Sequence, residues 1–233
     1  MENQMSGNSR IRYRGTGPGP QTLDGCSVEF YRRLPAASEP AIVASQVTPP
    51  ATLLELGCGT GRLTHPLLDL GFDVTAVDNS AAMLAHVQGA TKVLSDIETL
   101  ALDRTFDSVL LASRILNVPC EETRQALLQT VHRHLHTDGG VFLAEVHTPA
   151  ILQHAAGDAS TGPHYAGRIL AAESTGTHAS ITIEYTIEDK VWQQSFETEY
   201  LPEPAVIEAL RGVGLRFDGW VDEAGSWFRA SAA

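Results

Sequence analysis

A run of alternating glycines is the feature of this 233-residue chain whose residue types point most directly to chemistry. The stretch reads Leu-Leu-Glu-Leu-Gly-Cys-Gly-Thr-Gly over residues 53–61. Glycine lets the main chain approach a ligand closely or take a positive φ angle. We therefore predict a buried parallel strand, a glycine turn and the start of a helix. Such a turn presents a small polar ligand at the carboxyl edge of a sheet.

Two classes of ligand compete for this turn. The dinucleotide fingerprint is G-x-G-x-x-G/A, but here Arg62 occupies the sixth position, where close packing of helix on strand favours a small residue. Glu55 precedes the first glycine, where its charge would repel a pyrophosphate and attract an ammonium. Asp78 ends the next predicted strand, 21 positions after Gly57. A carboxylate that binds a ribose diol is expected at an offset of about 20. The residues thus favour a ligand with an amino group and a ribose, and do not require phosphate.

That combination resembles the class I S-adenosylmethionine-dependent methyltransferases, which carry E/D-x-G-x-G-x-G after the first strand and an acid at the end of the second. The further landmarks are Ser95-Asp96-Ile97-Glu98 after a third strand, a fourth strand at 106–111 and an Asp138-Gly139-Gly140 turn into a fifth. They extend over roughly residues 53–146 in the family's order. The resemblance implies S-adenosylmethionine as the cofactor.

The resemblance also implies a set of cofactor contacts. Methionine and ribose are expected at Glu55, Gly57, Gly59 and Asp78, and adenine at Asp96 and Ile97, with Met83 against its ring; Cys58, Asn79 and Ala112 complete the set. Cys58 is expected to act as a small side chain and not as a nucleophile. Core packing is the simpler interpretation of Met83 and is compatible with the first.

Candidates for catalysis and substrate binding follow the fourth and fifth predicted strands. Arg114 and Asn117 lie where this fold brings the cofactor sulfur to the substrate, although each could be an ordinary loop residue. His147 is the best acid–base candidate because its reference pKa suits neutral pH, with a hydrogen-bonded loop histidine as the alternative. Tyr31 is a candidate to close the site, although aromatic residues more often simply pack. Positioning supplies much of the rate of an in-line displacement, so an amine substrate does not require a base.

Three alternating histidines are the pattern that suggests a metal. Positions i and i+2 of a helix do not share a face, so only His132 and His136 could converge. Histidines near a helix C-terminus are already favoured by the helix dipole. No metal site is expected.

The predicted elements form an α/β, Rossmann-like doubly wound sheet, mostly parallel, with an antiparallel C-terminal hairpin. Strands are expected at about 51–56, 73–77, 92–94, 106–112 and 141–146, and the hairpin at 215–221 and 226–230. Helices are expected at 27–34, 39–47, 62–70, 81–87 and 205–211, with another that opens at Glu121. Residues 150–165 are expected to form a loop or broken helix.

An inserted antiparallel β block is expected after the fifth strand, at about 166–201. Its runs are 168–173, 178–188 and 191–201, and apolar residues alternate with polar ones from Ile181 to Ile187. One face therefore packs, and the polar face is free to meet a ligand or a second subunit. Methyltransferases that this chain resembles place a substrate-covering sheet there, whereas a simple elaboration or a dimer surface is the alternative. Residues 37–233 are expected to form the methyltransferase domain, and 1–36 a flap or a partly disordered segment.

Composition limits the partners. Sixteen basic and 28 acidic residues give a net charge of −12, which argues against nucleic acid as a substrate. Three widely spaced cysteines form no disulfide framework and indicate a reducing compartment. The N-terminus lacks the apolar core of a signal peptide or membrane span. A cytoplasmic monomer or homodimer without membrane association is expected.

The expected function is transfer of a methyl group from S-adenosylmethionine to an amine or hydroxyl of a small molecule or short peptide. Two alternatives stay open. One is a fold relative that uses the cofactor for another reaction, such as cyclisation. The other is a non-catalytic, cofactor-binding partner subunit.

Overall fold

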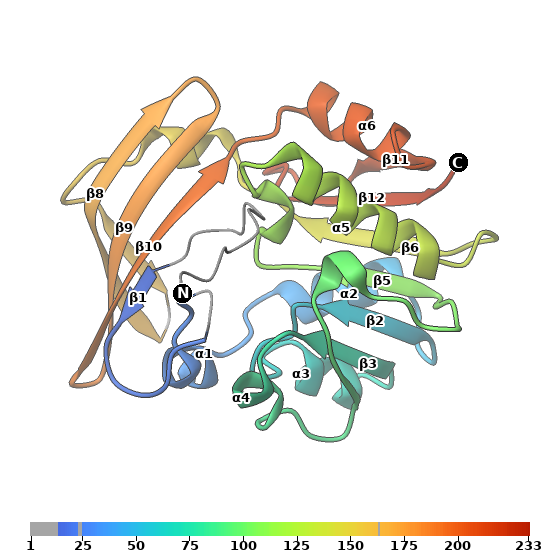
Figure 1. Ribbon diagram of the computed structural model, residues 1–233, viewed down its shortest axis with the longest axis horizontal. Helices are drawn as coiled ribbons and strands as arrows, with labels where there is room; N and C mark the ends of the chain where they lie inside the picture. Colours follow the sequence, from blue (N-terminus) through green and yellow to red (C-terminus); the bar gives the residue numbers. More distant parts are fainter. Residues whose placement is uncertain (1–13, 23–24, 163) are drawn as a thin grey trace, which may run out of the picture.

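The chain is built on two β-sheets that lie side by side (Figure 1). The structure is a computed structural model that describes residues 14–22, 25–162 and 164–233. We call the seven-stranded sheet the main sheet and the five-stranded antiparallel sheet the second sheet. Part of the predicted N-terminal flap, residues 1–13 and 23–24, lies outside the described residues.

The main sheet has the predicted doubly wound topology. Its strands are β2 (Thr52–Leu56), β3 (Asp73–Asp78), β4 (Thr91–Leu94), β5 (Ser108–Leu111), β6 (Val141–Glu145), β11 (Leu215–Trp220) and β12 (Trp227–Ala232), in the order β11-β12-β6-β5-β2-β3-β4. The strands from β6 to β4 in this order are parallel, and β12 pairs antiparallel with both β6 and β11. From β2 the chain adds β3 and β4 on one side, and it then crosses over to add β5 and β6 on the other side. The carboxyl ends of β2 and β5 therefore mark the switch point at which open α/β sheets bind ligands.

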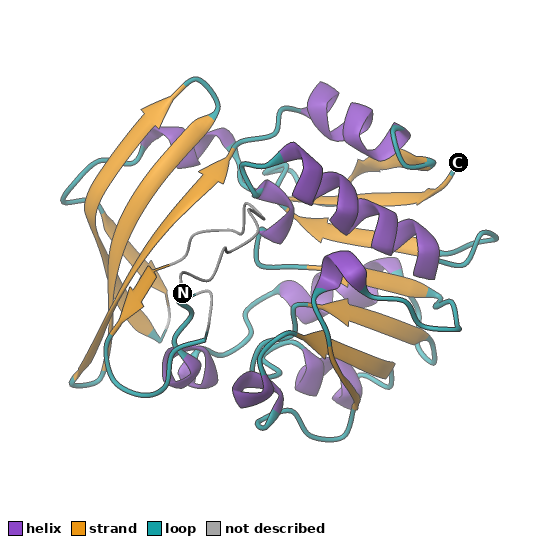
Figure 2. Ribbon diagram, viewed as in Figure 1, coloured by secondary structure: helices purple, strands orange, loops and turns teal. Residues whose placement is uncertain are grey.

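Helices cover both faces of the main sheet (Figure 2). They are α2 (Glu39–Gln46), α3 (Thr64–Asp69), α4 (Ala81–Leu84), α5 (Glu121–His134) and α6 (Glu203–Arg211), with the 3-10 turns η1 (Ile97–Thr99) and η2 (Ile115–Asn117). Successive side chains of a strand point to opposite faces. Leu53 of β2 accordingly packs in the cluster with α2 and α3, whereas Leu54 packs in the cluster with α5 and α6. Among the described residues, no helix is long and apolar enough to span a membrane.

The second sheet contains the predicted antiparallel block and two further strands. Its order is β1 (Arg14–Thr16), β10 (Lys190–Glu199), β9 (His178–Ile187), β8 (Tyr165–Thr175) and β7 (Ala159–Gly162). Residues 150–165 were expected to be a loop or broken helix, but they hold β7 as well as most of the 3-10 helix η3 (Pro149–Gln153). The expected start at about 166 is thus too late, because a four-residue edge strand shows too few alternations to be detected in a sequence.

The apolar face of the second sheet packs against η3 and against α1 (Val28–Arg33). Ile181 packs with Ile151 of η3. Tyr185 stacks on Phe30 of α1, with ring centroids 4.6 Å apart. The Tyr185 side chain of β9 is therefore directed toward the N-terminal helix.

The polar face of β9 points away from this packed side. Thr182 shares a hydrogen bond of 2.9 Å with Ser195, and Glu184 accepts one of 3.1 Å from Gln193. These bonds join neighbouring strands of the second sheet. The expectation that this polar face is free to meet a ligand or a second subunit stays a prediction.

Asn117 of η2 joins the two sheets. Its amide nitrogen donates to the main-chain oxygen of Glu199 in β10 at 2.7 Å, and its amide oxygen accepts the N–H of His147 at 3.0 Å. Arg124 of α5 forms an ion pair of 2.9 Å with the Glu199 carboxylate. Asn117 is only 1% exposed. It is therefore a buried connection between β10 and the loop after β6.

We expect Asn117→Ala to lower the free energy of unfolding by about 2–4 kcal/mol, because two buried main-chain groups lose their partners at about 1–3 kcal/mol each. Gln193→Ala removes an exposed side chain from the second sheet and should change stability by less than about 0.5 kcal/mol. Urea denaturation of both variants measures the difference. Equal effects would contradict the joining role of Asn117.

Candidate cofactor site and active site

A cavity of about 200 Å³ opens at the carboxyl ends of the parallel strands. Loops after β2, β3, β4 and β5 contribute to its wall, as does the N-terminal segment. Its lining residues are Thr22, Cys26, Tyr31, Glu55, Leu56, Gly57, Cys58, Gly59, Thr60, Arg62, Leu63, Asp78, Asn79, Met83, Ser95, Ile97, Glu98, Ala112, Ser113, Ile115 and Leu127. Most of the residues predicted to contact a cofactor therefore meet around one space.

The glycine turn leaves room for a ligand on its open side. Gly57 and Gly59 have positive φ angles of 74° and 55°. A Cβ atom on Gly57 would lie 2.5 Å from the Cδ1 of Ile115, whereas one on Gly59 would meet nothing within 4 Å. The first glycine is thus required by packing, and the second borders open space. Helix α3 starts at Thr64, two residues later than expected, after an extended run of turns.

Asp78 is held by main-chain donors at the end of β3. Its Oδ2 accepts the N–H of Gly59 at 2.8 Å, and its Oδ1 accepts the N–H of Ser80 at 2.9 Å. The N–H groups of Gly57 and Cys58 both donate to the oxygen of Val77, at 2.9 Å each. The end of β3 thereby orders the glycine turn and presents a carboxylate to the cavity.

Glu55 is a buried acid beside the same turn. It is 3% exposed, and the hydroxyl of Thr64 donates to its Oε2 at 2.5 Å. Burial raises the pKa of Glu55 from 4.5 to about 7, against the lowering effect of Thr64 and Arg62. The charge of this carboxyl therefore changes near neutral pH, and a cationic group in the cavity would favour its ionised form.

Some, but not all, of the residues predicted on the adenine side line the cavity. Met83, Ile97 and Asn79 line the cavity, together with Ala112 and Cys58. Burial strongly raises the pKa of the Cys58 thiol, which fits a small packed side chain and excludes a ready nucleophile. Asp96 is not among the lining residues; its Oδ1 instead accepts a hydrogen bond of 3.0 Å from Asn79. The neighbours of Asp96 in sequence, Ser95 and Ile97, reach the cavity in its place.

His147 lies outside the cavity lining. Its main-chain N–H donates to the amide oxygen of Asn117. Burial, together with the nearby Arg114 and His154, lowers the pKa of the His147 ring to about 3. A ring with that pKa is neutral at physiological pH and is a weak base. The structure thus lends no support to His147 as a general base.

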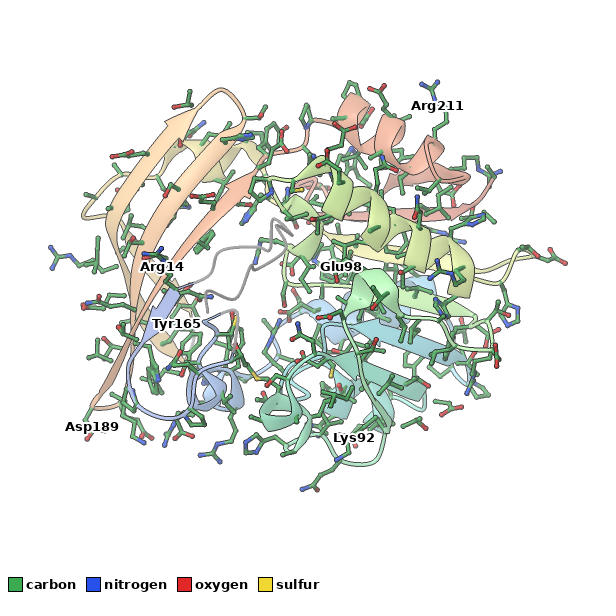
Figure 3. All side chains as sticks on the ribbon, viewed as in Figure 1. Arg14, Lys92, Glu98, Tyr165, Asp189 and Arg211 are labelled. Carbon is green, nitrogen blue, oxygen red and sulfur yellow. The ribbon has the colours of Figure 1, made fainter. Side chains whose placement is uncertain are left out.

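The three predicted substrate residues take different positions. Tyr31 lines the cavity from α1. Arg114 is 45% exposed, forms an ion pair with Glu145 at 2.8 Å, and lies near enough to Tyr185 to affect the pKa of its hydroxyl. Asn117 is buried, and both polar groups of its side chain have main-chain partners, so a direct substrate contact is not available to it. Figure 3 labels Glu98 on the main-sheet side and Tyr165, which packs on Tyr185, on the side of the second sheet.

Sequence reasoning missed several residues of this region, among them two in the N-terminal segment and two near the ends of β5 and β6. Thr22 and Cys26 line the cavity from a segment far from the glycine turn, and no local pattern marks them. Ser113 lines it from the loop after β5, and Glu145 at the end of β6 bonds to that loop. An acid at the end of a buried strand was the available signal for Glu145.

Two of the alternating histidines have separate hydrogen-bond partners, and the Nδ1 of His136 lies 3.1 Å from the Thr105 hydroxyl. His134 is buried, and its two ring nitrogens are bonded to Thr130 and Leu102. Within the described ranges, no group of three or more His, Cys, Asp or Glu side chains is arranged to hold a metal ion.

Known proteins agree with this architecture. Residues 53–139 match the family described as "Methyltransferase domain". The cypemycin N-terminal methyltransferase of a Streptomyces species is 33% identical over 162 residues, which are 64% of this chain and 66% of the relative. The CcbJ methyltransferase of Streptomyces caelestis has a TM-score of 0.72 at 20% identity, over 88% of this chain and 96% of that one. The S-adenosylmethionine-bound CalS10, an amino pentose methyltransferase from Micromonospora echinaspora, has a TM-score of 0.69 at 21% identity, over 88% and 95%.

Residues 53–139 match a methyltransferase domain, and the glycine turn and the sheet order give the chain the fold of the class I S-adenosylmethionine-dependent methyltransferases. The structural neighbours, at 20–21% identity, show the shared fold. The chain spans about half to two thirds of the length of the curated relatives that it matches first.

We expect Asp78→Ala to weaken binding of S-adenosylhomocysteine at least tenfold. The variant loses a charged acceptor for ligand hydroxyls, at about 1.5–3 kcal/mol per hydrogen bond, and the acceptor that orders Gly59. Asp73→Ala, at the exposed start of the same strand, is the matched control and should bind normally. Calorimetry on the two variants decides, and similar dissociation constants would refute the role of Asp78.

We expect binding of S-adenosylhomocysteine to tighten about tenfold between pH 6 and pH 8. Glu55, with a pKa of about 7, is mostly neutral below that pH and mostly ionised above it, and only the ionised form attracts the ligand's ammonium. Glu55→Gln should bind weakly and with little pH dependence. Calorimetric titration at several pH values measures both proteins, and parallel pH profiles would exclude Glu55 as the source.

Proposed function

We propose that this protein transfers the methyl group of S-adenosylmethionine to an amine nitrogen of a small molecule or short peptide. The observation that carries the proposal is the cavity at the switch point of the main sheet, with two carboxylates beside its glycine turn and the N-terminal segment across it. The cofactor supplies an activated methyl group on a sulfonium.

The cavity residues fit the cofactor. Glu55 and Asp78 both line the cavity, which supports binding of the methionine ammonium by Glu55 and of the ribose hydroxyls by Asp78. The open space at Gly59 admits the ligand next to the main chain. Met83 and Ile97 offer apolar surface for the adenine ring. One acid for the ammonium, one acid for the ribose diol and an apolar wall for the adenine ring match the three parts of S-adenosylmethionine.

The electrostatics favour an amine over a hydroxyl as the acceptor. A neutral amine carries its own lone pair and can attack without a base, whereas a hydroxyl is a poor nucleophile until a proton is removed. His147 is a weak base outside the cavity lining. The carboxylates that line the cavity belong to the cofactor end, as Glu55, Asp78 and Glu98. No described side chain is placed as a strong base on the substrate side, and positioning therefore supplies the rate.

The substrate is proposed to enter between the glycine turn and the apolar face of the second sheet. Tyr31 lines the cavity from α1, and Phe30 of the same helix stacks on Tyr185 of β9. Arg114 stands half-exposed near Tyr185 and could bind an anionic group of the substrate. Relatives named for N-terminal and amino sugar methylation support an amine substrate.

Matched acceptor pairs test the proposal. The protein is incubated with methyl-labelled S-adenosylmethionine and, separately, with an amino sugar and its hydroxyl parent, and with a free peptide and its N-acetylated form. We expect mass spectrometry to find one added methyl group on the amine member of a pair only. Equal transfer to the hydroxyl partner would overturn the preference for nitrogen. Cofactor binding with no methylated product from a broad amine panel would favour a non-catalytic subunit.

A further inference from the structure

The loop after β5 contains two consecutive residues in the left-handed region. Ser113 and Arg114 have φ angles of 57° and 59°, and the N–H of Ile115 donates to the oxygen of Ala112 at 3.4 Å. Positive φ at both central positions is the pattern of a type I′ turn, which strongly prefers glycine and asparagine there. Serine and arginine avoid this conformation unless the surroundings impose it.

This turn is part of the cavity wall. Ala112, Ser113 and Ile115 all line the cavity. The Cδ1 of Ile115 lies only 2.5 Å from the position that a Cβ on Gly57 would take, so the turn presses directly on the glycine turn. A change in the turn's φ angles would therefore move the wall opposite the glycines.

One carboxylate holds both strained residues. Glu145 is the last residue of β6 and is 6% exposed. Its Oε2 accepts the N–H of Ser113 at 2.8 Å, and its Oε1 forms an ion pair with the guanidinium of Arg114 at 2.8 Å. Because β6 is paired on both sides, with β5 and β12, this carboxylate is a fixed point beside the turn.

We propose that Glu145 is a positioning residue of the cofactor site: it imposes the left-handed conformation on Ser113 and Arg114 and thereby shapes the cavity wall. It touches neither cofactor nor substrate and acts through the turn. The inference rests on the cofactor site proposed above. The same contact also directs the Arg114 guanidinium.

Glycine supplies a test that separates this role from ordinary packing. We expect Glu145→Ala to raise the dissociation constant of S-adenosylhomocysteine at least tenfold, because the turn relaxes. Glycine takes positive φ without steric cost. Adding Ser113→Gly to Glu145→Ala should therefore recover at least threefold of the lost affinity, and Ser113→Gly alone is the reference with which the double variant is compared. Calorimetry on the full-length chain measures all four proteins.

Two further variants complete the design. Glu145→Gln keeps the volume and an acceptor oxygen for Ser113, so it should fold and lose less affinity than Glu145→Ala. Glu199→Gln breaks a comparable acid–arginine pair, with Arg124 outside the cavity lining, and should leave ligand affinity unchanged while it lowers the unfolding midpoint.

The possible failures point to different causes. Normal affinity of both Glu145→Ala and Glu145→Gln for S-adenosylhomocysteine, or no recovery of affinity with Ser113→Gly, would overturn the positioning role of Glu145. Failure of the unaltered protein to bind S-adenosylhomocysteine would instead refute the cofactor site on which this positioning role rests.

Discussion

A carboxylate out of contact with water is costly unless hydrogen-bond donors surround it, and this constraint organises the carboxyl edge of the main sheet. Three acids stand at or near the carboxyl ends of strands in the main sheet: Glu55 on β2, Asp78 on the adjacent β3 and Glu145 on β6. Their donors are respectively the Thr64 hydroxyl, the N–H groups of Gly59 and Ser80, and the N–H of Ser113 with the Arg114 guanidinium. Because nearly all of these donors belong to the loops that surround the cavity, satisfying the acids also shapes those loops.

The part of the fold that is encoded locally could be predicted from the sequence. Apolar runs, glycines and acids at strand ends occur within a few residues of one another, so the parallel strands, the glycine turn and Asp78 follow from short-range patterns. The long strands of the second sheet follow from the alternation between Ile181 and Ile187. Short strands such as β1 and β7 could not be predicted, because a strand of three or four residues is defined by its partner strand and carries little periodicity of its own.

The chemistry of single polar residues in loops could not be predicted for a different reason. His147 and Asn117 both follow or lie near strand ends, where functional residues concentrate. Their roles depend on burial and on partners 30 or 82 positions away in the chain, at which a sequence pattern carries no signal. Burial lowers the pKa of His147 to about 3. The side-chain amide of Asn117 is engaged by two hydrogen bonds to main-chain groups. Thr22 and Cys26 belong to the same class of residue, since only the folded path of the N-terminal segment brings them to the cavity.

The short 3-10 helix η2 connects these observations. Its first residue, Ile115, presses on Gly57 in the cofactor turn, and its last, Asn117, is bonded to Glu199 in the second sheet. A 3-10 helix has three residues per turn, so two residues this close point in different directions while they share one rigid segment. The proposed cofactor end and the proposed substrate end thus meet at a segment whose preceding residues, Ser113 and Arg114, contact Glu145. Under the proposed function, the main sheet keeps the cofactor geometry constant, and variation in the second sheet changes which substrate is presented to it.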